Sequence, residues 1–210
     1  MHMEDVLDLY TQPAAPSCPL VCFDETSKQL IGEVAPPLPA QPGQPERYDY
    51  EYVRNGVANL FMFFAPFHNW RHVKVTERRT KADWAYCMRD LVDVYFPDAP
   101  CIVVVEDHLN THNPAALYEV FPPAEAKRIL DRLQLHYTPK HGSWLNMAEI
   151  ELSVLNRQCL DRRIPDQPAL EHQVAAWEQH RNDTEATVRW RFTTSDARIK
   201  LKQLYPSIEP

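Results

Sequence analysis

Three carboxylates stand in local settings that suit the binding of divalent metal ions. Asp24 and Asp107 each end an apolar run typical of a buried strand, and Glu149 lies within a helical pattern. Mg²⁺ prefers octahedral oxygen coordination and is usually held by one or two carboxylates together with water and substrate phosphate. A pair of such ions can activate the attacking oxygen and stabilise the leaving oxygen of a displacement at phosphorus. These residues therefore predict the metal-dependent chemistry of nucleases and strand-transfer enzymes.

The helical pattern around Glu149 predicts which carboxylate faces the protein interior. Glu149 falls on the same face as Leu145 and Leu152, which follow the three- and four-residue spacing of a buried stripe. Glu151 is rotated from Glu149 by about 200° at about 100° per residue, so we expect its side chain in solvent. A buried carboxylate is costly without a cationic partner, which favours Glu149 as the metal ligand.

The strand acids leave more than one assignment open. Glu25 directly follows Asp24, and Glu106 directly precedes Asp107. Neighbouring strand residues face opposite sides of a sheet, and alternation alone does not say which member of each pair faces a site. An Asp at the end of a strand is also common in turns and helix caps, so each Asp taken alone is more often structural than catalytic.

Three segments of the chain match catalytic segments of a known family. They are 22–25 (CFDE), 106–112 (EDHLNTH) and 137–149 (YTPKHGSWLNMAE), and the last is the most specific. Together they resemble segments of bacterial insertion-sequence transposases of the DDE superfamily, which are related to mariner elements. The segments 150–155 and 190–194 are also similar, so the resemblance covers nearly the whole chain.

The resemblance implies an α/β, ribonuclease-H-like fold with a mixed central sheet flanked by helices. In that fold the first and fourth strands are adjacent, which brings Asp24 and Asp107 together. Carried over by position, these two residues and Glu149 form the catalytic triad that holds Mg²⁺ or Mn²⁺, with two ions expected. His108 departs from the family pattern, which usually has Asn after the second acid. Residues expected to support the site or to contact DNA are His108, Asn110, His112, Lys140, His141, Trp144 and Asn146.

The resemblance also implies a function. We expect the catalytic domain of a DNA transposase, which cleaves DNA at element ends and joins the freed 3′-hydroxyl to target DNA. Expected partners are double-stranded DNA, a second copy of the chain on that DNA, and an upstream helix-turn-helix segment. The expected location is the bacterial cytoplasm, at the nucleoid. The alternatives are a stand-alone nuclease of the same fold and a non-mobilising, DNA-binding or dimerising remnant.

The length of 210 residues suits one good-sized domain. We expect a linker remnant at 1–18, the catalytic domain at 19–185 and a basic tail at 186–210. The net charge of -7 is unusual for a protein that binds phosphates, so local basic residues must supply the contacts. Basic residues gather in three clusters, at 71–81, 157–163 and 189–202.

Hydrophobic periodicity and capping residues predict the order of helices and strands. The predicted strands lie at about 20–25, 57–65, 72–77, 99–107 and 134–137. The predicted helices lie at about 3–10, 80–95, 115–121, 123–133, 145–160 and 167–180. A Pro-rich segment at 35–45 predicts an extended surface loop.

Other chemistries find less support. His108 and His112 have a zinc-like spacing, but Asn110 and Pro114 suit a loop rather than the helix that this spacing requires. The five cysteines show no paired metal spacing and three lie in apolar patterns, which predicts reduced, buried thiols. No apolar run is long enough to span a bilayer, so no membrane partner is expected.

Overall fold

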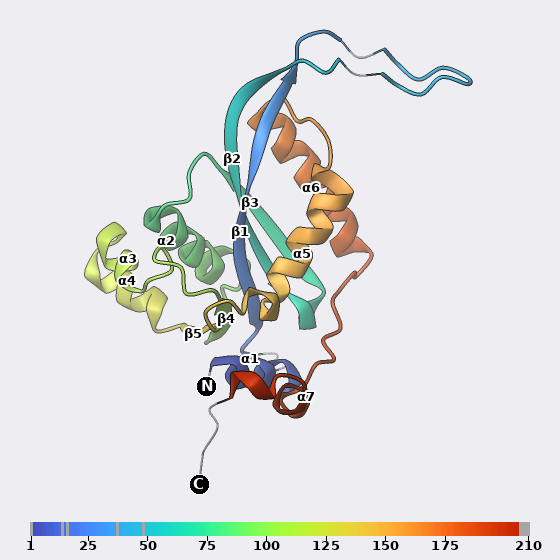
Figure 1. The fold of residues 1–210 in the computed structure, drawn as a ribbon. Helices are drawn as coiled ribbons and strands as arrows, with labels where there is room; N and C mark the ends of the chain where they lie inside the picture. The colour runs from blue at the N-terminus through green and yellow to red at the C-terminus, as the bar shows by residue number, and fades with distance from the viewer. Residues whose placement is uncertain (1, 14, 16, 37, 48, 206–210) are drawn as a thin grey trace.

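A mixed five-stranded sheet organises the fold (Figure 1). The computed structural model describes residues 2–13, 15, 17–36, 38–47 and 49–205. The strands are β1 (Leu20–Glu33), β2 (Tyr52–Ala65), β3 (Trp70–Thr76), β4 (Ile102–Glu106) and β5 (Leu133–Tyr137).

The strand order is β3-β2-β1-β4-β5. The first three strands pair antiparallel in sequence order, whereas β4 lies parallel to β1 and β5 lies parallel to β4. Parallel neighbours need a crossover connection, which explains why helices separate β3, β4 and β5 along the chain. The predicted α/β fold with a mixed central sheet is confirmed, including the adjacency of the first and fourth strands.

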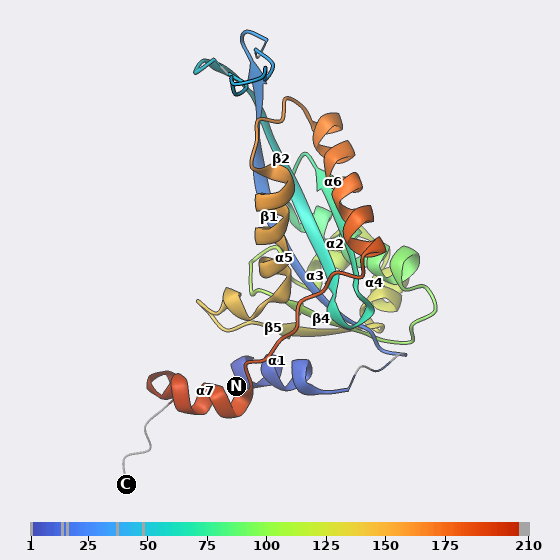
Figure 2. The same cartoon turned by 90° about the vertical axis from the view of Figure 1, so that its right-hand side faces the viewer.

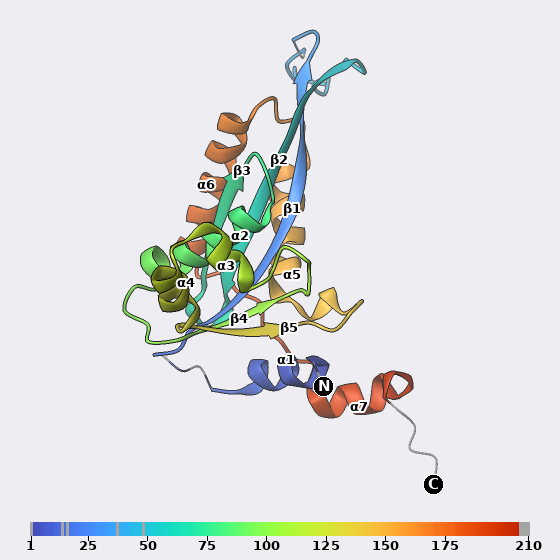
Figure 3. The same cartoon turned by 90° about the vertical axis from the view of Figure 1, so that its left-hand side faces the viewer.

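Helices cover both faces of this sheet (Figures 2 and 3). They are α1 (His2–Thr11), α2 (Lys81–Asp90), α3 (Ala115–Val120), α4 (Pro123–Leu130), α5 (Met147–Leu155), α6 (Gln167–Asp183) and α7 (Thr194–Lys200). α5 and α6 lie on one face, and α2, α3 and α4 lie on the other. α1 and α7 lie together at one end of the sheet.

The alternation of side chains along β1 explains why the protein has two apolar cores. Cys22 packs in the core that includes Leu152 of α5, whereas Phe23 packs in the core that includes Trp84 of α2. Successive strand residues face opposite sides of a sheet. A strand covered on both sides therefore needs a continuous apolar run, as the sequence of β1 has up to Phe23.

β1 and β2 project beyond the rest of the sheet as a two-stranded ribbon (Figure 1). The sequence predicted that β1 ends near Glu25, but the strand continues to Glu33. This continuation is largely polar and pairs with β2 alone among the described strands, so it lacks the apolar signal of the buried part. The predicted Pro-rich loop lies at the tip, where Leu38 bridges Arg47.

The helix predicted at 145–160 is divided into three parts. A 3₁₀ turn at Ser143–Leu145 precedes Asn146, whose side chain accepts a hydrogen bond from the Ala148 N–H and caps α5. α5 then continues as a π-helical turn at Asn156–Leu160. The cap fixes the start of α5 at Met147, so Glu149 lies in the first turn of the helix.

The segment predicted as a basic C-terminal tail contains a packed helix. α7 begins with a capping box between Thr193 and Asp196. Arg198 of α7 forms an ion pair with Glu4 of α1, with nitrogen–oxygen distances of 2.7 and 3.0 Å. The two predicted terminal segments therefore contact each other, although residues 1, 14, 16 and 206–210 lie outside the described chain.

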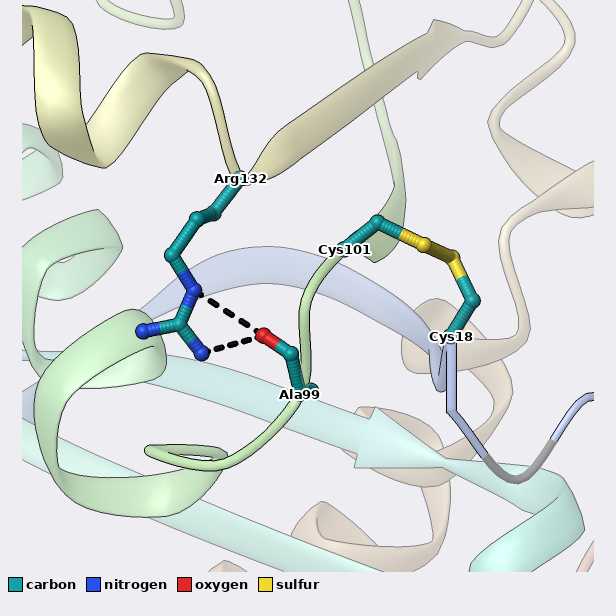
Figure 4. The surroundings of a disulfide bond; sticks show 4 residues. All are labelled: Cys18, Ala99, Cys101 and Arg132. Carbon is teal, nitrogen blue, oxygen red and sulfur yellow. Dashed lines mark hydrogen bonds between the residues drawn. A yellow bond between two sulfur atoms is a disulfide. The ribbon is translucent and has the colours of Figure 1, made fainter.

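The structure corrects the prediction that all five cysteines are reduced. Cys18 and Cys101 form a disulfide bond (Figure 4), whereas Cys22, Cys87 and Cys159 are free and buried. The bonded pair lies just before β1 and β4, where the sequence offers no metal or disulfide motif. Among the described helices, none combines the length and apolar character needed to cross a membrane.

Candidate active site

Asp24, Asp107 and Glu149 line one open pocket of about 390 Å³. Asp24 lies in β1, Asp107 directly follows β4, and Glu149 lies in the first turn of α5. β1 and β4 are parallel, with Cys22 opposite Val105. The two acids stand two residues further along each strand, so they reach the same edge and the same face of the sheet.

The alternation of side chains separates Glu106 from Asp107 at the end of β4. Asp24 and Asp107 have the parity of Cys22 and Val105, which belong to the core beneath α5. Glu106 has the opposite parity and is fully buried, where its Oε2 accepts a hydrogen bond of 2.9 Å from the Trp84 indole. In this pair Asp107 rather than Glu106 lines the pocket, whereas Glu25 lines it together with Asp24.

The predicted orientation of Glu149 and Glu151 was wrong. Glu149 is exposed to the pocket, whereas Glu151 is fully buried and contacts two arginines. Arg71 Nε lies 2.9 Å from Glu151 Oε1, and Arg181 donates bonds of 2.7 and 3.0 Å to the two carboxylate oxygens. The cationic partner expected for a buried acid on this helix is thus arginine, and it belongs to Glu151.

A signal for this arrangement exists in the sequence of β3. Arg71 has the same strand parity as Val73 and is fully buried, so it faces the interior. Its guanidinium also contacts the Asn182 side chain at 3.0 Å and lies over the Phe64 ring. A charged residue on the buried parity of a strand predicts a buried partner of opposite charge. Arg71 lies outside α5, so the periodicity of that helix alone does not indicate it.

The electrostatics of the pocket suit cation binding. Burial, together with the smaller effect of the neighbouring charges of Glu25, Asp107 and Glu149, raises the pKa of Asp24 to about 7, although a 2.8 Å hydrogen bond from the Glu25 N–H opposes the rise. A carboxylate in such a setting gains most from a nearby positive ion, because the ion stabilises its charged form.

His112 is a buried cation beside the pocket. Its Nδ1 lies 2.8 Å from Asp107 Oδ1, and its Nε2 lies 3.1 Å from Glu25 Oε2. Burial lowers the pKa of His112, but the bonds to Asp107 and Glu25 and the charge of Glu106 outweigh it and raise the value to about 11. For Asp107, burial raises the pKa, but the hydrogen bond and the charge of His112 outweigh burial and bring the pKa below its usual value. Asp107 is therefore ionised at neutral pH.

The other predicted site residues take different places. Lys140 and His141 line an adjoining pocket together with Asp107 and His108, whose ring packs edge-on against Tyr137. Asn110 lies in an exposed turn.

Trp144 and Asn146 differ in burial. Trp144 is 44% exposed and stacks on Trp190, with Phe192 at its edge. Asn146 is fully buried and donates a hydrogen bond of 2.7 Å to the Phe23 carbonyl. Asn146 therefore links the start of α5 to β1.

The three pocket carboxylates offer oxygen donors, which are the ligands that Mg²⁺ accepts. Within the described residues, no group of three or more His, Cys, Asp or Glu side chains is assembled closely enough to hold a metal by itself. Zinc sites need such a compact set of protein ligands, whereas Mg²⁺ uses one or two carboxylates and fills the rest with water and phosphate. Three oxygen donors around an open pocket fit the second kind of ion.

Comparison with known proteins agrees with this geometry. The sequence model described as "DDE superfamily endonuclease" matches residues 19–171. The chain belongs to this family. No curated protein matches it in sequence.

Three solved structures of Mos1 mariner complexes are similar to this chain. The paired-end complex with Mn has 14% identity and a TM-score of 0.59, covering 88% of this chain and 54% of that chain. The paired-end complex with Mg has 14% identity and a TM-score of 0.58, covering 87% and 54%. The strand transfer complex has 11% identity and a TM-score of 0.58, covering 85% and 52%. This chain thus spans about half the length of these proteins and shares their ribonuclease-H-like fold.

Proposed function

We propose that this chain is the catalytic part of a DNA transposase, which cleaves DNA strands at element ends and transfers them to target DNA. The observation that carries the proposal is the pocket lined by Asp24, Asp107 and Glu149 in a DDE superfamily endonuclease. The similar structures bear the names of paired-end and strand-transfer complexes, which supports transposition over other uses of the fold.

The three carboxylates would hold two divalent ions, Mg²⁺ or Mn²⁺. When bound, such ions activate the attacking oxygen and stabilise the leaving oxygen of a phosphodiester. Asp24 is near enough to Asp107 and Glu149 for both charges to raise its pKa, so the three form one electrostatic unit. This unit needs no protein side chain as a covalent nucleophile.

Neighbouring residues of the chain prepare and flank this unit. The contact from His112 holds Asp107 in its ionised form. Lys140 and His141 are exposed in the adjoining pocket that Asp107 shares, where a cationic side chain suits the DNA phosphate next to the cleaved bond. Asn146 sets the position of α5 and hence of Glu149.

We further propose that double-stranded DNA is the substrate, bound by two copies of the chain with an upstream helix-turn-helix segment. The setting would be the bacterial cytoplasm at the nucleoid. The net charge of -7 leaves phosphate binding to local basic residues, so DNA binding by this chain alone should weaken steeply with salt. Phosphate contacts do not read sequence, so sequence preference would come from the upstream segment.

Nicking of supercoiled plasmid in Mn²⁺ tests the proposal. Wild type should convert the plasmid to open circles, and Asp24→Asn, Asp107→Asn and Glu149→Gln should each abolish conversion without loss of folding. Asp98→Asn is the matched control, because Asp98 is an exposed carboxylate before β4 and outside the pocket lining. Retained nicking in all three pocket variants would show that the pocket is not the active site.

A joining assay separates the transposase from a nuclease of the same fold. Pre-cleaved duplex with a labelled 3′-hydroxyl end should become attached to plasmid in the presence of Mn²⁺. Nicking without any joining, even with two DNA ends supplied, would favour the nuclease.

A further inference from the structure

β1 and β4 meet along a short parallel ladder. The described pairing runs from Leu20 opposite Val103 to Cys22 opposite Val105. By contrast, the ladder between β1 and β2 continues to Glu33 at the far end of β1. The β1–β4 seam, defined as this short ladder, joins the antiparallel part of the sheet to the β4–β5 part. It therefore depends on few backbone hydrogen bonds, and it is the seam that aligns the two strand acids of the pocket.

The Cys18–Cys101 disulfide lies in register with those acids. The bonded cysteines are 83 residues apart, and the same offset separates Leu20 from Val103 within the seam. The same offset also separates Asp24 from Asp107. The disulfide thus closes one end of the seam, while the acids stand at the other end. Because a one-residue slip would turn a strand's side chains to the opposite face, the covalent bond excludes the slipped registers.

The segment that carries Cys101 is held by contacts that do not involve the disulfide. Arg132 donates a hydrogen bond of 2.9 Å to the Ala99 carbonyl (Figure 4) and one of 2.7 Å to the Phe96 carbonyl. The Ile102 N–H also donates to the Arg132 carbonyl at 2.7 Å. Cys101 is therefore presented to Cys18 by a braced loop, so the bond can form and break without refolding that loop.

The bonded cysteines are also accessible, unlike the free ones. Both are partly exposed, and Cys18 lines a surface pocket of about 200 Å³. The three free cysteines are buried within the cores. A small thiol reagent therefore reaches the disulfide in preference to the other sulfur atoms.

We propose that the Cys18–Cys101 disulfide is a redox-controlled staple for the β1–β4 seam. In the oxidised chain the bond holds the register that aligns Asp24 and Asp107, and in the reduced chain the seam opens more often and metal binding weakens. The metal-binding consequence rests on the proposed function, whereas the effect on the seam does not.

The switching reaction is thiol–disulfide exchange with a dithiol. A thiolate of the dithiol attacks one sulfur of the pair, which breaks the Cys18–Cys101 bond and forms a mixed disulfide. The second thiol of the reagent then displaces the bound cysteine and closes its own disulfide. Two electrons and two protons have passed to Cys18 and Cys101, and the dithiol has become oxidised.

Hydrogen exchange of the full chain tests the staple itself. Peptides covering 19–24 and 102–107 should exchange about tenfold faster in dithiothreitol than in the oxidised protein, whereas peptides of β2 and β3 should not change. The double variant Cys18→Ser/Cys101→Ser should show the fast rate in both conditions, which excludes an effect through the buried thiols. Equal seam exchange in oxidised and reduced wild type, or free Cys18 and Cys101 after diamide treatment, would overturn the proposal.

Mn²⁺ titration followed by melting temperature tests the consequence for the pocket. The apparent Mn²⁺ affinity should be about tenfold lower in reduced than in oxidised wild type, since removing groups that orient metal ligands typically costs 10–100-fold. Asp24→Asn is the control for the metal site. If it responds to Mn²⁺ like wild type, the proposed function fails, while seam exchange still decides the staple. If it abolishes the response but affinity is independent of redox state, the staple proposal fails and the metal site stands.

Discussion

The Asn146 side chain donates a hydrogen bond of 2.7 Å to the carbonyl oxygen of Phe23. Phe23 directly precedes Asp24, and Asn146 lies three residues before Glu149. The same Asn146 side chain accepts a bond of 3.1 Å from the Ala148 N–H and caps α5. One buried amide thus sets both where α5 begins and where it rests on β1, which positions Glu149 relative to Asp24.

Replacing this amide should impair both stability and cleavage. Asn146→Ala removes the cap, worth about 1 kcal/mol, and leaves the buried Phe23 carbonyl unpaired, which costs roughly 1–3 kcal/mol more. Urea denaturation should show this loss, and plasmid nicking should fall because Glu149 is no longer held in place. Asp166→Ala is a matched control, since Asp166 caps α6 in the same way but far along the chain from the pocket.

The control should lose about 1 kcal/mol of stability and retain nicking. If Asn146→Ala nicks DNA as fast as Asp166→Ala under conditions where both are folded, Asn146 has no positioning role.

The two glutamates of α5 should behave in opposite ways. Glu151→Gln leaves Arg71 and Arg181 without their carboxylate and should lower the free energy of unfolding by about 3–5 kcal/mol. Glu149→Gln should leave stability in metal-free buffer unchanged within about 0.5 kcal/mol, because its side chain is exposed. Urea denaturation in EDTA makes the comparison. A larger loss for Glu149→Gln than for Glu151→Gln would contradict the observed orientation.

His112 should be essential for the stability of the acid cluster. His112→Gln removes the cation that contacts Asp107 and Glu25, and it leaves buried carboxylates together, which should cost about 3–5 kcal/mol at pH 7. Because the pKa of His112 is raised, its contacts contribute stability that is fully present below about pH 6.5 and is lost as the pH rises toward 11. The difference in free energy of unfolding between wild type and the variant should therefore be smaller at pH 10.5 than at pH 6.5.

His108→Gln is the control for this pH series, because His108 is exposed and packs on Tyr137 rather than on an acid. An unchanged stability of His112→Gln at pH 7 would mean that the cluster does not depend on the imidazolium.

The raised pKa of Asp24 predicts that the folding stability of the metal-free protein depends on pH. Its folded pKa of about 7 is raised above the usual 3.8, so the folded state retains a proton that the unfolded state has released between these values. The contribution of Asp24 to stability should accordingly decrease as the pH rises from about 4 to about 7, by on the order of 2–4 kcal/mol. Asp24→Asn should flatten this part of the curve, and a variant curve with the wild-type slope would contradict the shift.

Metal should reverse the effect of pH on Asp24. A divalent ion binds the ionised carboxylate, so its stabilisation should be small at pH 5 and complete at pH 8. The rise in melting temperature on adding Mg²⁺ at these two pH values measures it. An equal rise at pH 5 and pH 8 would mean that the ion binds outside this carboxylate group.

The sequence predicted the sheet core and the meeting of the acids well. The apolar runs before Asp24 and Asp107 are continuous because both faces of those strands are covered, and this gives a strong signal. The capping box of Thr80 and Asp83 at the start of α2 is also a local feature, because its two hydrogen bonds join residues only three apart. Such features are local, so one segment suffices to find them.

Features that depend on distant partners could not be predicted in this way. The burial of Glu151 depends on Arg71, a strand residue 80 positions earlier, and the bonded state of Cys18 depends on Cys101 across the β1–β4 seam. The outer half of β1 is largely polar and pairs with β2, so its strand conformation depends on a partner that lies later in the chain. In each case the partner lies far away in the sequence, so the pattern of one segment does not identify it.

Mn²⁺ binding, measured by electron paramagnetic resonance of the free ion in a titration at pH 8, tests whether Asp24, Asp107 and Glu149 form one site for divalent metal. We predict that wild type and Asp98→Asn bind Mn²⁺ alike. Asp24→Asn, Asp107→Asn and Glu149→Gln should each weaken that binding by about tenfold or more, because each removes a proposed metal ligand. Unchanged Mn²⁺ affinity in all three pocket variants would contradict the account.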